Sequence, residues 1–148
     1  MGHNGIRCDS WGDGHYGSRR TKLNGSVYSH KGVDYLYEPG QPVIVNVDAE
    51  FVRIVMPYAD SREYTGMHLK TEWCEFRLFY VKPEGMSFDS NIKQGDIIGK
   101  AQDISKRYGF NSKGQKMDNH VHVEIVSIDP DFISKVLEVG NGRLYKNC

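Results

Sequence analysis

The chain has 148 residues and a mass of 16.9 kDa, a length that fits a single domain. Hydrophobic residues make up 39% and charged residues 26%, which is typical of a globular protein that buries a core. Lys+Arg and Asp+Glu both number 19, so the net charge is zero, and this balance argues against nucleic acid or an anionic membrane as a partner. No apolar run approaches the roughly 20 residues that span a bilayer, and no secretory signal is visible.

The chain is expected to divide into a short arm and one domain. Residues 1–29 hold few apolar side chains and many of Gly, Ser, Arg and Asn, a composition that favours an irregular, glycine-rich arm. Residues 30–148 contain the patterned segments and are expected to form the domain itself.

Most of that domain is predicted to consist of short strands separated by Gly and Pro turns. The predicted strands are rich in β-branched and aromatic residues and cover approximately 31–37, 43–47, 50–56, 65–70, 72–83, 92–102 and 120–126. Helix signals are limited to one turn at 103–109 and a better segment that begins at Asp129 and stops at Gly140. The pattern predicts a mainly β protein, an antiparallel β-sheet or sandwich with one short C-terminal helix.

The cysteines do not suggest a disulfide framework or a thiolate metal site. The chain contains Cys8, Cys74 and Cys148, an odd number, and no two are spaced as C-x-x-C. Cys74 lies between aromatic residues on a predicted strand and is expected to be an inert thiol in the core.

The clearest strand, HVHVEIV, carries two histidines on one face. Side chains alternate along a strand, so His120, His122 and Glu124 share one face while the two valines and Ile125 are expected to pack on the other. Two imidazoles at this spacing can bind one metal ion, or one can bind the metal while the other transfers protons. Histidines on an exposed sheet face are the simpler alternative.

A second motif, HKGVD, places His30 and Asp34 in H-x-x-x-D spacing where a loop enters a strand. Alone, this spacing is common and most often has no function. Together with one histidine of the H-x-H motif, however, it offers a His, Asp, His donor set. Such a set is normal for catalytic zinc, which keeps its fourth position open for water.

These motifs resemble those of the lysostaphin/LytM-type zinc metallopeptidases, which are antiparallel β-folds of the duplicated hybrid motif type that hydrolyse peptides of bacterial cell-wall cross-links. The resemblance rests on HKGVD at 30–34, IKQGDIIGKAQ at 92–102 and HVH at 120–122. It implies one Zn²⁺ per chain, held by His30, Asp34 and His122, with His120 as the catalytic imidazole.

A narrower resemblance points to one branch of that family, the branch of the vertebrate leukocyte cell-derived chemotaxin 2 and its bacterial and phage relatives. It rests on IRCDSWGDGHYGSRR, HKGVDYL, LFYVKP and HVHVEI. The secreted chemotaxin has disulfides, and this chain has Cys8 and Cys74 at matching positions. The partner positions hold Asp13, Tyr37 and Val126 instead.

One family residue differs in this chain. The usual Y-x-H-L motif supplies a further catalytic histidine, but the matching stretch reads Tyr80-Val81-Lys82-Pro83, so Lys82 stands in its place. A lysine is a poor base at neutral pH but can stabilise an oxyanion as a point charge. His68 is an alternative replacement, although a surface histidine is the simpler interpretation.

Other polar residues near these motifs also have two interpretations. Arg19 and Arg20 could guide a substrate carboxylate, but an exposed charged loop is the simpler interpretation. Tyr16, Tyr28 and Tyr80 could donate hydrogen bonds near the metal, but the chain has nine tyrosines and packing is the simpler interpretation of any one of them.

Two functions are therefore expected as alternatives. The first is a zinc endopeptidase that acts outside the cytoplasm on peptidoglycan peptides, with His120 and Lys82 in catalytic roles. The second is a non-catalytic, chemotaxin-like zinc protein that binds a protein partner.

Overall fold

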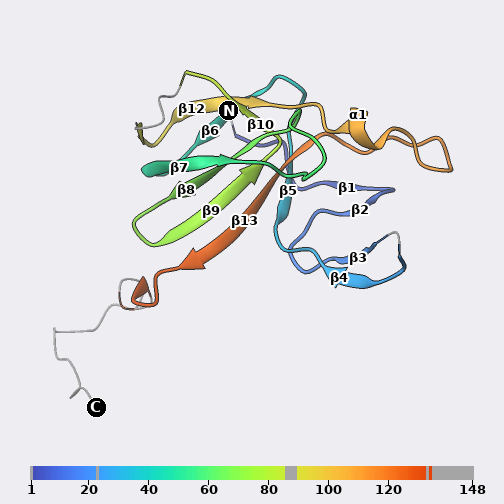
Figure 1. Cartoon of the computed structure of the whole chain (residues 1–148), viewed down its shortest axis with the longest axis horizontal. Coiled ribbons are helices and arrows are strands. Elements are labelled where there is room, and N and C mark those ends of the chain that lie inside the picture. The colour runs from blue at the N-terminus through green and yellow to red at the C-terminus, as the bar shows by residue number, and fades with distance from the viewer. Residues whose placement is uncertain (1, 23, 86–89, 133, 135–148) are drawn as a thin grey trace, which may run out of the picture.

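The computed structural model describes residues 2–22, 24–85, 90–132 and 134. Its largest element is a six-stranded antiparallel sheet (Figure 1). The strands in spatial order are β11 (Asn91–Ile92), β7 (Ala49–Val55), β8 (Gly66–Lys70), β9 (Cys74–Phe79), β13 (His120–Ile128) and β5 (Val33–Leu36). The described elements also include a short α-helix, α1 (Ser105–Tyr108). The predicted mainly β fold is confirmed.

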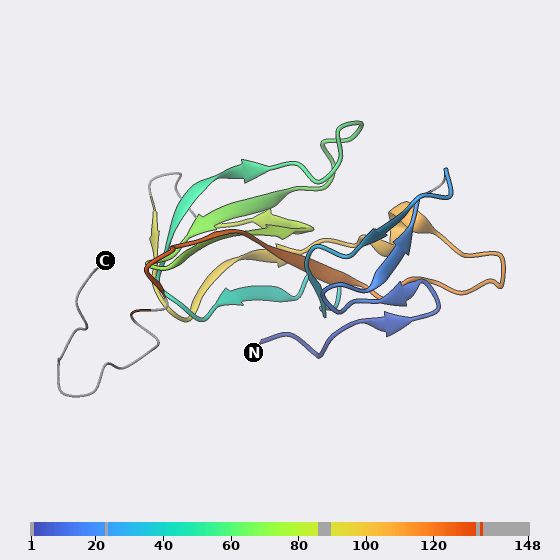
Figure 2. The same cartoon turned by 90° about the horizontal axis from the view of Figure 1, so that it is seen from below.

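A second sheet packs against one face of the first and closes the core (Figure 2). It contains β10 (Val81–Pro83), β12 (Asp96–Ala101) and β6 (Pro42–Val45), also antiparallel. Apart from Ile104, which lies just before α1, the largest fully buried side chains come from the two sheets: Val43, Met67, Leu69, Val81, Ile98 and Val121. Since these aliphatic residues occupy one face of each sheet, the opposite face of the large sheet remains available for polar groups.

Strand β13 follows the expected alternation over its first half. Val121 is buried in the core and Val123 packs against it, while His120 and His122 lie on the other face. The expectation that Ile125 packs with the valines is wrong, because its side chain is 57% exposed. The pairing of β13 with β9 shifts register just beyond Ile125, and this part of the strand lies outside the buried cluster.

The N-terminal arm is more regular than its composition suggested. It contains two short hairpins, β1 (Cys8–Asp9) with β2 (Gly12–Asp13) and β3 (Arg19–Thr21) with β4 (Val27–Ser29). The residues before β1 run antiparallel beside β5, with hydrogen bonds between the backbones of Asn4 and Leu36 and of Arg7 and Asp34. The arm therefore extends the edge of the large sheet.

The remaining expectations concern the cysteines and the helices. Cys74 is buried, as predicted, Cys8 is exposed, and both are free thiols. The helix expected over 129–140 lies largely outside the described residues, as does Cys148. Among the helices of the described ranges, none has the length and apolar character needed to cross a membrane.

Two neighbouring isoleucines of β12 test the position of the core. Ile98 is fully buried, whereas Ile97 is 57% exposed. We expect Ile98→Ala to lower the free energy of unfolding by about 2–5 kcal/mol, because it leaves a cavity between the sheets. Ile97→Ala is the matched control and should change it by less than about 0.5 kcal/mol. Denaturant titration measures both, and equal effects would contradict this packing.

Candidate metal centre

Three side chains expected to bind zinc converge on the polar face of the large sheet. Asp34 on β5 lies directly opposite His122 on β13 in the strand register, and His30 comes from the loop just before β5. The Nδ1 atom of His122 lies 2.8 Å from Oδ1 of Asp34 and 3.1 Å from Nε2 of His30. Nε2 of His30 is 3.2 Å from the same carboxylate oxygen. Three potential ligand atoms therefore surround one point.

Glycine is required inside the H-x-x-x-D motif by this close approach. A Cβ atom at Gly32 would lie 2.6 Å from Cε1 and 2.7 Å from Nε2 of His122, and would also collide with the carbonyl oxygen of Val123. Any side chain at Gly32 would therefore push β13 away from the loop that carries His30.

The donor set fits zinc in its chemistry and spacing. His, Asp and His atoms are normal zinc ligands, and ligand atoms of a tetrahedral site with bonds of about 2.0–2.1 Å lie about 3.3 Å apart. The observed separations of 2.8–3.2 Å are close to that value. His30 is also oriented, since its Nδ1 lies 3.0 Å from the carbonyl oxygen of His15 and can donate to it, leaving Nε2 for the metal.

His120 lies beside this donor set and is oriented in a similar way. Its Nδ1 is 2.9 Å from the carbonyl oxygen of Asp118, and its Nε2 lies 3.9 Å from Oδ1 of Asp34. Burial lowers the pKa of His120 below its ordinary value, an effect that the charge of Asp34 opposes only in part. A neutral imidazole with its free nitrogen next to the donor set can accept a proton.

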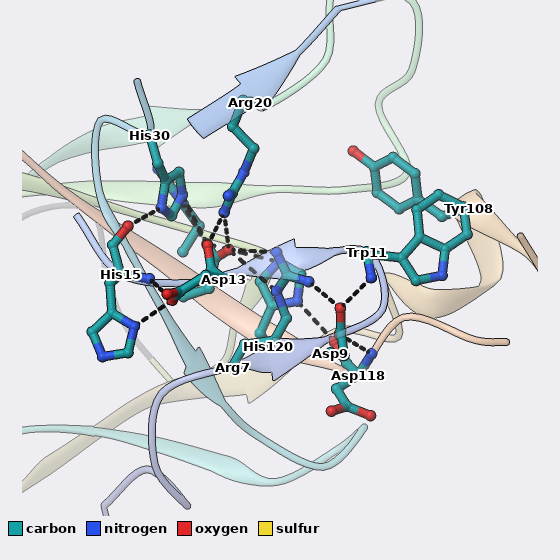
Figure 3. A network of polar contacts seen from close by, with 12 residues as sticks. Arg7, Asp9, Trp11, Asp13, His15, Arg20, His30, Tyr108, Asp118 and His120 are labelled. Atoms are coloured by element: carbon teal, nitrogen blue, oxygen red, sulfur yellow. Dashed lines mark hydrogen bonds and ion pairs between the residues drawn. The ribbon is translucent and has the colours of Figure 1, made fainter. Parts of the chain in front are cut away.

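The second oxygen of Asp34 is held by arginines from the N-terminal arm. Figure 3 shows Arg7 and Arg20 reaching into the same network of polar contacts. Arg7 reaches Oδ2 with Nη2 at 3.1 Å and Nε at 3.3 Å, and Nη2 of Arg20 lies 3.5 Å away. Arg7 is itself buried and also pairs with Asp9 at 2.7 Å. Burial raises the pKa of Asp34, but hydrogen bonds from His122 and His30 outweigh it and hold the pKa well below its usual range. Asp34 is therefore ionised and fixed on both sides.

His120 and the three residues of the donor set line a cleft of about 360 Å³. One part of its wall comes from the arm, through Arg7, Trp11, Arg20 and Tyr28. The rest of the lining includes the charged Lys31 and Glu124 and a group of aromatic or apolar residues: Pro57, Phe79, Tyr80, Tyr108 and Met117. The ring of Phe79 stacks on that of His122 with centroids 5.7 Å apart. Polar and apolar side chains are therefore both available to a ligand in this cleft.

The structure does not bring Lys82 into this cleft. Its side chain is exposed on β10 and does not belong to the cleft lining, whereas Tyr80, two residues earlier, does. The expected surface position of His68 is wrong, because this residue is buried and its Nε2 lies 2.9 Å from Glu75; it also lies outside the lining. Arg20 is half-buried on Asp34, while Arg19 is exposed as expected.

Several groups at the site were not found from the sequence. Arg7 lies in the IRCDSWGDGHYGSRR stretch, but nothing in that stretch assigns it to Asp34, and a pattern of side chains does not report the backbone carbonyl oxygens of His15 and Asp118. The one available signal was the glycine-rich arm, because small residues allow a backbone to approach closely. Gly14 shows this, since a Cβ there would lie 2.9 Å from Cβ of Asp34.

Comparison with known proteins identifies the fold. No protein-family model and no curated protein matches the chain. The catalytic domain of the antimicrobial peptidase lysostaphin from Staphylococcus simulans is similar at 20% identity and a TM-score of 0.52, over 87% of this chain and 92% of that one. A zinc-containing peptidase from Vibrio cholerae is similar at 20% identity and a TM-score of 0.50. That match covers 84% of this chain but spans only 36% of the Vibrio protein. The chain thus has the fold of lysostaphin-type peptidases.

The buried pair between Arg7 and Asp34 is open to a direct test. We expect Arg7→Gln to lower the free energy of unfolding of the metal-free protein by about 3 kcal/mol, because a buried carboxylate loses its main cation while Arg20 remains. Arg19→Gln removes an exposed arginine of the same arm and should cost less than about 0.5 kcal/mol. Chemical denaturation in the presence of a chelator gives both values. Equal losses would show that the pair contributes nothing specific.

The lowered pKa of His120 predicts a pH dependence. The unfolded chain takes up a proton at this residue near pH 6.5, while the folded protein resists it, so stability is lost as the pH falls through that region. Between about pH 7.5 and about pH 5.5, the metal-free wild type should lose up to about 1 kcal/mol more than His120→Gln. Thermal or denaturant unfolding measures the free energy of unfolding of both proteins at each pH. If it changed with pH equally in the wild type and in His120→Gln, a buried neutral imidazole at His120 would be contradicted.

Proposed function

We propose that this chain is a zinc-dependent endopeptidase domain. The observation that carries the proposal is the position of His120. Its free nitrogen lies beside a three-donor His, Asp, His set, in an open cleft and in the fold of known peptidases. A purely structural zinc site is normally closed by a fourth protein ligand. Within the described residues, the clustered donors are only these three.

The residues of the cleft have separate roles in this proposal. His30, Asp34 and His122 would hold Zn²⁺, which when bound polarises a peptide carbonyl and lowers the pKa of water. His120 accepts the proton of the attacking water at Nε2 and returns it to the leaving amine. The carbonyl of Asp118 fixes the orientation of His120, and Arg7 with Arg20 fixes Asp34.

The proposed substrates are the short, flexible peptides of peptidoglycan cross-links, which contain glycine or D-amino acids. Support comes from the motif resemblance and from the shared fold, together with an open cleft that offers both charged and aromatic or apolar side chains around the His, Asp, His set. Action on such a substrate would take place outside the cytoplasm, in the cell wall, the periplasm or the medium.

A binding role without catalysis is the second candidate, because one observation favours it. The position that carries a catalytic histidine in the resembling peptidases holds Lys82, and its side chain lies outside the cleft. Under this alternative the zinc would be retained for stability, and the protein surface would bind a protein partner, as the resemblance to the chemotaxin branch implies.

Cleavage assays separate the two functions. Purified peptidoglycan and a pentaglycine peptide are incubated with zinc-loaded wild type, with a chelator-treated sample and with His120→Ala, and products are identified by mass spectrometry. We expect cleavage by the wild type, none after chelation, and a loss of at least about 100-fold in His120→Ala with zinc retained. Lys82→Ala should cleave like the wild type. No cleavage by protein that holds one zinc per chain would instead favour the binding role.

A further inference from the structure

Tyr80 has an unusual backbone conformation at the wall of the cleft. Its φ of +68° makes it the one non-glycine residue with a positive φ within the described ranges. Such a conformation is uncommon for a bulky residue and persists only where the surroundings fix it. Here the amides of Tyr80 and Val81 both donate to the carbonyl of Thr65, at 2.9 and 3.1 Å, and the Tyr80 carbonyl accepts from Gln102 at 2.8 Å.

This conformation changes which side chains reach the cleft. Tyr80 lies where the chain leaves β9 of the large sheet and enters β10 of the small one. The usual alternation is interrupted there, so Phe79 and Tyr80 both line the cleft. Alternation then resumes, which places Val81 in the core and Lys82 in solvent. The same backbone feature therefore removes Lys82 from the site and introduces a tyrosine.

The Tyr80 hydroxyl belongs to a chain of tyrosines. The Tyr58 hydroxyl donates to that of Tyr80 at 3.2 Å and lies 2.8 Å from that of Tyr108. The guanidinium of Arg107 lies over the Tyr58 ring, 3.6 Å from its centroid, and also pairs with Asp60. These two contacts hold Tyr58 in place. Since Tyr80 accepts from Tyr58, its own hydroxyl proton is left for a further acceptor, and a chain of hydrogen bonds polarises that proton.

Tyr80 is also close to the catalytic imidazole. Its ring meets that of His120 edge-on, with centroids 5.5 Å apart. Burial raises the pKa of Tyr80 well above its ordinary value, and the charge of Asp34 adds to the rise, so the hydroxyl stays protonated at neutral pH. A protonated phenol is a donor suited to a developing negative charge.

We propose that the Tyr80 hydroxyl donates a hydrogen bond to the oxyanion that forms on the substrate carbonyl, the role expected of Lys82 from its sequence position. The inference rests on the proposed peptidase function. No proton is transferred in this step, since the phenol only shares its hydrogen with the oxygen. Tyr58 and Tyr108 are positioning residues, because they act through Tyr80.

The test compares binding with turnover in Tyr80→Phe. The probe is a glycine-containing phosphinate peptide, whose tetrahedral anionic centre imitates the oxyanion, and calorimetry measures its Kd for the zinc-loaded protein. The carboxamide peptide of the same sequence reports ground-state binding. Tyr16→Phe is the matched control, because this tyrosine is 75% exposed, and Lys82→Ala tests the alternative donor.

We expect Tyr80→Phe to weaken phosphinate binding at least about tenfold, leave amide binding and zinc content unchanged, and lower kcat on the order of 100-fold with little effect on KM. Tyr58→Phe should give a smaller effect of the same kind. Phosphinate affinity equal to wild type in Tyr80→Phe, or lost in Lys82→Ala, would overturn the inference. The proposed function fails separately, through absence of zinc-dependent cleavage by the wild type, because the phosphinate comparison does not require turnover.

Discussion

The buried carboxylate of Asp34 is the group on which the rest of the site depends. One oxygen faces the two histidines of the donor set, and the other is held by arginines of the arm. A buried carboxylate is costly unless its lone pairs are satisfied, and here each oxygen has its own partners. The strand pairing that sets Asp34 opposite His122 thereby also fixes where the arm must dock.

Much of the fold was predictable because its patterns are local. The period-two alternation of HVHVEIV reports which face is polar, and the register of β13 with β5 then brings His122 to Asp34. The H-x-x-x-D spacing predicted two of the donors, and Gly32 between them has a direct steric reason. The burial expected for Ile125 was wrong because alternation predicts which face a side chain lies on, but not how far along the strand the core extends. Here the register shifts just beyond Ile125, where the strand is no longer covered by the core.

The contacts that could not be predicted are those that join distant segments. Arg7 lies 27 residues from Asp34 in the sequence, and Tyr58 is separated by 22 residues from Tyr80 and by 50 from Tyr108. The position of Lys82 was also beyond the sequence, because one positive φ at Tyr80 decides which side chain enters the cleft. A motif fixes only the spacing of its residues along the chain. Whether a given side chain points into the cleft depends on the local backbone conformation.

The arm has a further consequence for the architecture of the molecule. It supplies Arg7 and the His15 carbonyl to the centre and Trp11 to the cleft wall, while its first residues extend the sheet edge beside β5. Docking of the arm and occupancy of the donor set act on the same carboxylate, so the two equilibria are thermodynamically linked. Proteolytic nicking and amide exchange in residues 4–22 would thus report on occupancy of the donor set, even though none of those residues belongs to it.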